Sequence, residues 1–193
     1  MKRTSWFWLA GLFLLFLPAA CPQPAAGAEA TGVLLEVTAP GGSDIDLREE
    51  VFYYFGTSEE PVTAVSFSPQ LTISALKMEY DRKEEVLSAR GEVFFTSAEI
   101  KLRAEEVKVC LRQEVFTVTG GFQLTTGEMN LTGRVLEGNI PEGIITAAGA
   151  VEWCFQEMEG KAENLLYRQK EKRVYFSGTP VVRWEQGWME GFE

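Results

Sequence analysis

The chain has 193 residues, of which 46% are hydrophobic and 12% aromatic, so it can bury a real core and is not a disordered tail. Its formal net charge of −10 predicts a surface that repels nucleic acid and anionic membrane faces. The sequence has no histidine, which excludes an imidazole base, a Ser–His pair and a histidine-ligated metal.

The N-terminal segment has the features of an export signal. Lys2-Arg3 precedes an apolar run (6–17), and Ala26-Gly27-Ala28 supplies small residues at the spacing that signal peptidase reads. We therefore expect residues 1–28 to be a cleaved signal peptide. Two alternatives stay open. In the first, the apolar run is kept as a short membrane anchor, although about 20 residues are normally needed to span a membrane. In the second, Pro18-Ala19-Ala20-Cys21 is a lipoprotein cleavage box.

Export would change both the charge and the thiol chemistry. Loss of residues 1–28 removes two basic residues and no acidic one, leaving a net charge of −12. It also places Cys110 and Cys154 outside the cytoplasm, where disulfides persist. A Cys110–Cys154 disulfide and two separate thiols both remain open. The expected location is periplasmic or otherwise extracytoplasmic.

The segment 32–69 contains three candidate strands, "GVLLEV", "EVFYYF" and "AVSFS". Between the first two, "SDIDLREE" at 43–50 alternates acidic residues that could contact calcium. We favour a turn with polar ends for this stretch.

From residue 70 onwards the sequence repeats every 29 residues. The repeat is marked by glycines, each preceded sixteen positions earlier by a small residue. The glycines are Gly91, Gly120, Gly149 and Gly178, and the small residues are Ala75, Ala104, Gly133 and Ala162. Two and four positions beyond each glycine the residues are apolar, and five positions beyond it they are mostly polar. This alternation predicts strands with one buried face.

Each repeat predicts two strands of about eight to ten residues, giving eight strands in the four repeats. The apolar phase slips at each small residue, which indicates a bulge or bend there. A polar turn follows, for example "DRKEE" after Tyr80 and "RQKEK" after Tyr167. Each repeated glycine lets a strand curve sharply or lets a bulky group lie against bare backbone. Glycines that only mark strand corners in a filled sandwich remain the alternative.

Two stretches, "LTISALKMEYDRKEEVLSARGEVFF" and "MEGKAENLLYRQKEKRVYFSGTPVVRWEQGWMEG", resemble the repeat of OstA-like proteins. These are lipopolysaccharide-transport periplasmic proteins of the LptA and LptC kind. The resemblance covers about 70–193. The matching positions are Ala75, Tyr80, Gly91 and Val93, and Ala162, Tyr167, Gly178 and Pro180. The family's usual aspartate after the anchor alanine is replaced by Leu76, Glu105 and Glu163.

The resemblance implies an all-β fold, an antiparallel jelly-roll of two curved sheets formed by a single domain at 29–193. It also implies an apolar trough that holds the acyl chains of lipopolysaccharide, or of another lipid, without a cofactor. The implied partners are other transport-bridge proteins or an ABC transporter complex, and further copies of the chain joined end to end through terminal strands. The candidate lining residues are Val93, Phe95, Leu102, Phe122, Leu124, Leu131, Val151, Trp153, Phe155, Val182 and Trp184.

The sequence does not favour an enzyme. Cys110 and Cys154 lack the paired spacing of a zinc site, and acidic pairs such as Glu84-Glu85 and Glu105-Glu106 fit solvated turns or bends. The alternative to lipid binding is a structural or adhesive β-repeat module, solenoid-like, with a fully packed interior. Strand polarity separates the two, because a solenoid stacks parallel strands whereas a jelly-roll pairs antiparallel ones. Trp188 is a candidate interface residue.

Overall fold

The computed structural model describes residues 35–67, 70–127, 129–185 and 187–191, all of which belong to the unit Thr31–Glu193. The expected export signal at 1–28, with its anchor and lipoprotein alternatives, lies outside the described residues. Within those residues, no helix has the length and apolar character needed to cross a membrane.

The described part of the chain is almost entirely β-structure, with sixteen strands and one short 3-10 helix, η1 (Gln169–Glu171). The first six strands are β1 (Leu35–Thr38), β2 (Ser43–Asp46), β3 (Val51–Phe55), β4 (Val62–Phe67), β5 (Gln70–Ala75) and β6 (Lys77–Asp81). The next five are β7 (Val86–Ser97), β8 (Ile100–Cys110), β9 (Val115–Thr126), β10 (Met129–Gly133) and β11 (Val135–Asn139). The last five are β12 (Ile144–Phe155), β13 (Met158–Arg168), β14 (Arg173–Ser177), β15 (Val181–Trp184) and β16 (Gly187–Glu190).

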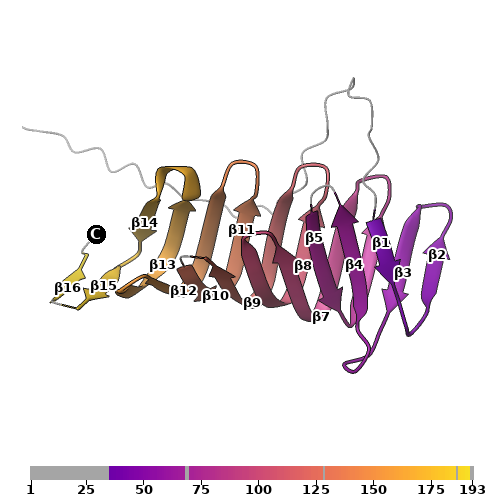
Figure 1. The fold of residues 1–193 in the computed structure, drawn as a ribbon, viewed down its shortest axis with the longest axis horizontal. Helices are drawn as coiled ribbons and strands as arrows, with labels where there is room; N and C mark the ends of the chain where they lie inside the picture. The colour runs from indigo at the N-terminus through magenta and orange to yellow at the C-terminus, as the bar shows by residue number, and fades with distance from the viewer. Residues whose placement is uncertain (1–34, 68–69, 128, 186, 192–193) are drawn as a thin grey trace, which may run out of the picture. The chain divides into compact units, whose positions relative to one another are not determined.

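The strands form two layers because the long strands cross from one layer to the other (Figure 1). For example, one half of β7 pairs with β6, and the other half pairs with β5. Layer 1 contains β2, β3, β6, β11, β14 and the adjoining halves of β7, β8, β9, β12 and β13. Layer 2 contains β1, β4, β5, β10, β15, β16 and the other halves of those long strands.

Every strand pairing among the described residues is antiparallel. The predicted antiparallel two-layer arrangement is therefore confirmed. The solenoid alternative is wrong for this part of the chain, because a solenoid requires parallel stacking.

The four repeated glycines lie at the bends where the chain passes between the layers. All have positive φ: 77° at Gly91, 83° at Gly120, 84° at Gly149 and 74° at Gly178. Glycine adopts this left-handed region without the steric cost that a Cβ brings. Crowding adds a second reason, because a Cβ on Gly178 would lie 2.5 Å from Cβ of Glu163. Both uses of glycine that the sequence suggested, curvature and close approach, therefore apply here.

The prediction of eight strands in the four repeats is wrong, since residues 70–184 form the eleven strands β5–β15. Three predicted strand segments are interrupted at bends, between β5 and β6, between β10 and β11, and between β14 and β15. In β8 and β13 the chain passes the equivalent bend without interruption. The bends therefore divide the chain less regularly than the 29-residue spacing suggests.

A row of turns forms one edge of layer 1, here called rim 1, at the top of Figure 1. It comprises residues 82–85, 111–114, 140–143 and 169–172. Backbone hydrogen bonds join successive turns. The N–H groups of Leu111, Ile140 and Gln169 donate to the carbonyls of Glu85, Glu114 and Gly143, at 2.9, 3.1 and 2.8 Å. Segments 97–100, 125–127 and 155–158 form the facing edge of layer 2, here called rim 2.

The hydrophobic core lies between the layers and runs from β4 to β13. Phe95 of layer 2 and Phe116 of layer 1 meet across it, with ring centroids 5.3 Å apart. Both side chains are fully buried. The middle of the interior is therefore filled by the protein's own side chains.

Candidate functional site

The inward-facing side chains of layer 2 were predicted as the lipid-contacting surface. Eight of the eleven predicted residues are buried: Val93, Phe95, Leu102, Phe122, Leu124, Leu131, Val151 and Trp153. Phe155 and Val182 are partly buried and pack against the core. The structure thus brings ten of these side chains to one face of the sheet, directed toward layer 1.

Trp184 differs from the expectation that it faces a covered interior, because its side chain is 43% exposed. Layer 1 ends with β14, whereas layer 2 continues through β15 and β16. The end of layer 2 therefore extends beyond the strands that would cover it. Alternation along the strand predicted the face of Trp184 but not the loss of the opposite layer.

Aromatic rings lie over glycines at three directly paired positions inside the sandwich, a relationship that the sequence analysis missed. The pairs are Phe116 with Gly138, Phe122 with Gly133, and Trp153 with Gly160. A Cβ added to these glycines would lie 2.2, 2.8 and 2.7 Å from the facing ring. The signal was present in the sequence, since Gly160 is the one residue at its repeat position that is not a large apolar residue.

Trp153 also closes the packed interior toward the C-terminal end of the unit. Its ring stacks on Phe176 of layer 1, with centroids 4.7 Å apart and an interplanar angle of 22°. Its indole Nε1 is buried and has no hydrogen-bond partner among the described residues. Beyond this pair, Phe155 and Val182 are only partly buried.

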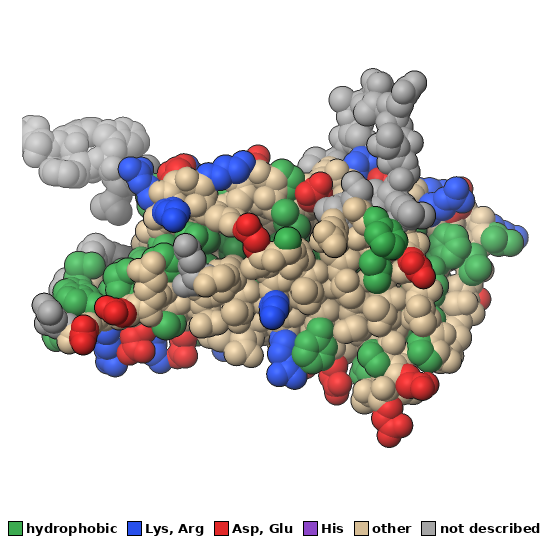
Figure 2. Space-filling model, in the orientation of Figure 1, with side chains coloured by type: hydrophobic (Ala, Val, Ile, Leu, Met, Phe, Trp, Pro, Cys, Tyr) green, Lys and Arg blue, Asp and Glu red, His purple; other side chains and the backbone are tan. Residues whose placement is uncertain are grey.

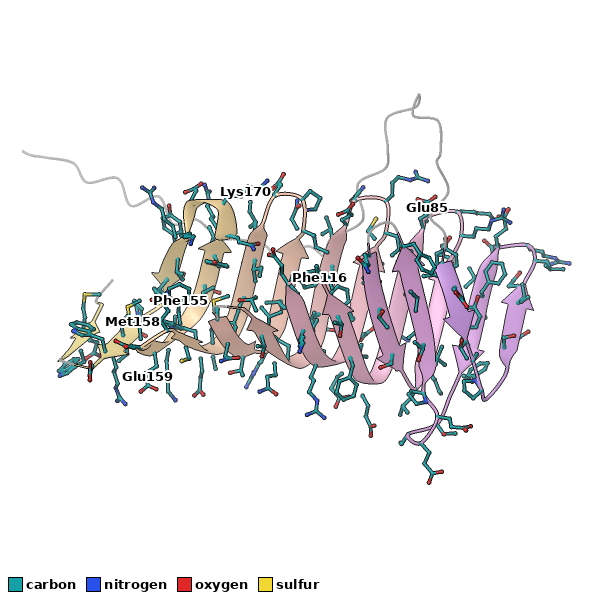
Figure 3. All side chains as sticks on the ribbon, viewed as in Figure 1. Glu85, Phe116, Phe155, Met158, Glu159 and Lys170 are labelled. Atoms are coloured by element: carbon teal, nitrogen blue, oxygen red, sulfur yellow. The ribbon has the colours of Figure 1, made fainter. Side chains whose placement is uncertain are left out.

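Apolar side chains are exposed at this C-terminal end, as Figure 2 shows around β15 and β16. Trp188, predicted as a candidate interface residue, is 66% exposed. The others are Met158, Tyr175, Trp184 and Met189. Figure 3 places Phe155 and Met158 together near the same end. The end therefore combines an apolar surface with the edge strands β14 and β16, each of which pairs with one neighbour only among the described strands.

The gap between rim 1 and rim 2, here called the mouth, contains two neighbouring cavities of about 570 and 430 Å³. Both are lined by Glu99 and Ile100 of rim 2, by Gln169 of rim 1 and by Ile145 of β12. The larger one also reaches Tyr167, and the smaller one Phe116. These volumes lie within the range of small-molecule sites. Sequence reasoning did not single out the mouth, because its residues come from turns about 70 positions apart.

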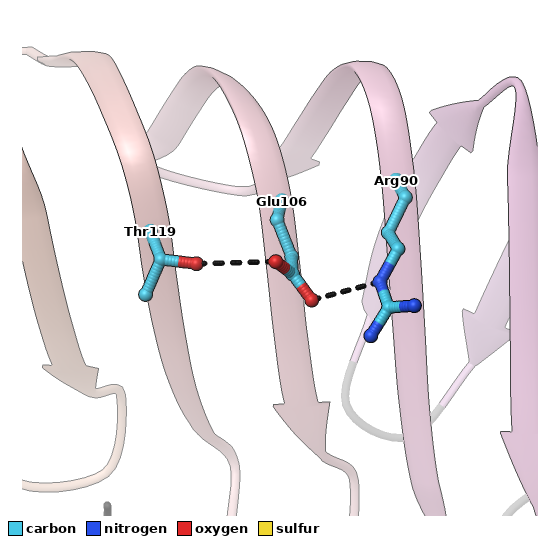
Figure 4. A network of polar contacts seen from close by, with 3 residues as sticks. All are labelled: Arg90, Glu106 and Thr119. Carbon is cyan, nitrogen blue, oxygen red and sulfur yellow. Dashed lines mark hydrogen bonds and ion pairs between the residues drawn. The ribbon is translucent and has the colours of Figure 1, made fainter.

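Charged groups form their networks on the outer surface. Arg90 Nε donates to Glu106 Oε1 at 2.8 Å, and Thr119 Oγ1 donates to Glu106 Oε2 at 3.4 Å, across three adjacent strands (Figure 4). The hydrogen bond with Glu106 raises the pKa of Arg90. On rim 1, the hydrogen bond from Arg112 to the buried Glu85, at 2.9 Å, likewise raises the pKa of Arg112. These contacts stabilise the surface and the rim, not a reactive centre.

The structure offers no metal centre among the described residues, since no cluster of three or more potential acidic or sulfur ligands occurs there. Cys110 is buried in layer 1 and Cys154 is exposed on layer 2, and no disulfide joins them. The acidic stretch 43–50 forms β2 and a turn. Asp46 Oδ1 accepts hydrogen bonds from the backbone N–H groups of Arg48 and Glu49, at 2.9 and 3.1 Å. The turn interpretation holds for the second half of this stretch.

Comparison with known proteins gives a family match. The family described as "LptA/(LptD N-terminal domain) LPS transport protein" matches residues 72–191. One similar solved structure is LptH from Pseudomonas aeruginosa, the LptA-homologous periplasmic component of the lipopolysaccharide transport device. It is 17% identical, with a TM-score of 0.52 over 56% of this chain and 82% of that chain. This likeness confirms the jelly-roll fold. No match was found among curated proteins.

Proposed function

The chain belongs to the LptA/LptD N-terminal domain family of LPS transport proteins, and from this membership we propose that it holds acyl chains of lipopolysaccharide, or of another acylated lipid, between its two layers. The observation that carries the proposal is the continuous apolar face shared by the two layers. This face is bordered by cavities at the mouth and by exposed apolar side chains at the C-terminal end.

The composition of the interior supports binding without catalysis. Among the described residues, the buried polar or charged side chains are Ser66 and Glu85, and Glu85 pairs with Arg112 on rim 1. An apolar face contributes about 0.8 kcal/mol per buried CH2 group and imposes no directional chemistry. Because the middle of the interior is filled, an acyl chain reaches Phe95 or Leu124 only when the layers separate. The half-covered residues Phe155 and Val182 can be contacted with less rearrangement.

A direct test uses tryptophan fluorescence and an alkyl chain that carries a heavy-atom quencher. One full-length variant retains Trp153 alone, with the other four tryptophans replaced by phenylalanine, and a matched variant retains Trp188 alone. We expect dibromostearic acid to quench the fluorescence of Trp153 more strongly than that of the exposed Trp188. Lipopolysaccharide should relieve the quenching of Trp153, because it competes for the same interior. Absence of quenching at Trp153 at millimolar probe would contradict lipid binding in the interior and favour a purely structural module.

We further propose that the unit joins other proteins end to end, as part of a bridge outside the cytoplasm. Edge strands β1 and β2 at one end, and β14 and β16 at the other, each leave one side without a partner among the described strands. Such edges accept a strand from another chain. The occupant is a second copy, another transport-bridge protein or a subunit of an ABC transporter complex.

Association through β14 can be tested by sedimentation of the full chain. Tyr175→Lys places a charge on this edge strand, a device that natural proteins use to block strand addition. Gln123→Lys is the matched control, because it makes the same change in net charge at an exposed position of β9, a strand that is paired on both sides. We expect concentration-dependent association of the wild type and the control, and weaker association of Tyr175→Lys. Equal association of all three would contradict the role of β14.

The export proposal has a simple measurement. N-terminal sequencing of the mature protein from a cell-envelope fraction should find a start near Glu29, leaving a single domain at 29–193. A chain that begins at Met1 would support a retained anchor. A lipid-modified Cys21 would support the lipoprotein alternative.

A further inference from the structure

The two cavities at the mouth share a polar contact that crosses from one rim to the other. Gln169 Nε2 of rim 1 donates a hydrogen bond to Glu99 Oε2 of rim 2. The same two residues line both cavities. The contact therefore belongs to the wall that the two cavities share, and the two cavities together are here called the slot.

The walls of this slot change from polar at the rims to apolar toward the core. Glu99, Gln169 and Thr125 belong to the rims, where water reaches them. Below them lie Ile145 and, in the larger cavity, Tyr167, both of which are members of the buried core. In the smaller cavity the buried Phe116 takes the same place. A slot with wet rims and an apolar floor fits a single alkyl chain whose polar end stays outside.

Resting on the proposed function, we propose that this slot is the lateral port through which one alkyl chain of an acylated lipid enters the interior, and that the Glu99–Gln169 hydrogen bond is a clasp that opens for it. The clasp suits this role because it is exposed and joins two side chains from turns, so water can replace each partner. The clasp joins the two rims directly above Ile145 and Phe116, the core residues that line the floor of the slot.

The rest of rim 1 is held by contacts that opening of the clasp leaves intact. Gln169 donates its backbone N–H to the Gly143 carbonyl, while its side chain makes the clasp. Lys170, in the same 3-10 turn and labelled in Figure 3, donates from its side-chain Nζ to the carbonyl of Pro141 within rim 1. A change in the Gln169 side chain should therefore alter the link between the rims without unfolding the turn.

The test is the association rate of a neutral alkyl probe, pyrenedecanol, with the full chain at neutral pH. Gln169→Glu sets two carboxylates against each other across the mouth and should hold it open. The rate should rise by roughly five-fold, the effect expected of one like-charge contact in a wet site. Glu99→Lys combined with Gln169→Glu restores an attractive pair and should return the rate to the wild-type value or below it.

Lys108→Gln is the matched control, because it makes the same change in net charge at an exposed position of β8 and leaves both the clasp and the turns of rim 1 intact. Its rate should equal that of the wild type, and all variants should keep the wild-type thermal midpoint. The proposal is overturned if Gln169→Glu binds the probe at the wild-type rate, or if the double variant is as fast as Gln169→Glu. If the probe binds to no form of the protein, the proposed lipid binding fails as well, which is a different result from unchanged rates.

Discussion

The ring of Phe122 in β9 lies over Gly133, its direct partner in β10. A Cβ on Gly133 would be 2.8 Å from the edge of this ring, closer than atoms in a relaxed structure approach. In a later unit the equivalent positions hold Val151 and Ala162, which also pair directly. The interior is therefore fitted by complementary sizes: a larger ring faces a smaller partner.

This complementarity predicts a measurable coupling between the two positions. Gly133→Ala should lower the free energy of unfolding by about 1–3 kcal/mol, because the added methyl overpacks the site. The combination Phe122→Val with Gly133→Ala recreates the Val–Ala pair and should cost less than the sum of the single changes, by about 0.5–3 kcal/mol. Denaturant unfolding measures both quantities. Gly127→Ala, where a Cβ would meet open space, is the control and should have little effect on stability. If the losses of unfolding free energy at positions 122 and 133 were strictly additive, the size complementarity of this pair would be contradicted.

Replacing a glycine at a bend should destabilise the protein in two separable ways, through backbone strain and through crowding of the added Cβ. Gly178 has a φ of 74° and a Cβ there would meet Glu163, whereas Gly42 has a φ of 99° and open space around it. Gly42→Ala should therefore show only backbone strain, about 1–3 kcal/mol. Gly178→Ala should cost more, because crowding is added to the strain. Equal losses in thermal or denaturant unfolding would show that the contact with Glu163 does not matter.

The polar network on the outer surface and the hydrophobic core should contribute very differently to the free energy of unfolding. Arg90 and Glu106 are 65% and 42% exposed, so Arg90→Ala should change the free energy of unfolding by less than about 1 kcal/mol, and less still in high salt. Phe116→Ala removes a ring that joins the layers and should cost about 3–5 kcal/mol. Chemical denaturation compares them. A large loss for Arg90→Ala would mean that the outer face holds the layers together.

The turn after β2 predicts a pH effect that can be followed at one residue. The backbone N–H groups of Glu49 and Arg48 lower the pKa of Asp46 below its usual 3.8. Since the folded pKa is lowered, the stabilising contribution is present above the unfolded value and is lost as pH falls through the folded one. NMR titration of the Asp46 carboxyl in the folded protein, compared with the same residue in urea, measures this. A folded pKa equal to or above the unfolded one would contradict the contacts.

The sequence predicted the inward face of layer 2 well, because strand alternation depends only on near neighbours such as Val151 and Trp153. It could not show that the long strands exchange layers. A bend looks the same in sequence whether the strand continues through it, as at Glu105 in β8, or is interrupted, as at Leu76 and Arg134, which is why eleven strands occur where eight were expected.

Features that depend on distant parts of the chain were out of reach. Glu99 and Gln169 meet only because the repeats stack the rims side by side. Trp184 has the inward phase, yet its exposure is decided by where layer 1 stops. Gly160 looked like an exception to the repeat, although it provides the space that the Trp153 ring occupies.

Site-specific photocrosslinking tests the central claim, that acyl chains lie between the layers, most directly. A photoreactive phenylalanine replaces either Phe155, which is partly buried and packs against the core, or Phe94, which is exposed and stacks on Arg103 on the outer face. Both replacements keep an aromatic side chain in layer 2. With purified lipopolysaccharide, we predict a crosslink from position 155 and none from position 94; crosslinking from position 94 alone, or from neither, would contradict the account.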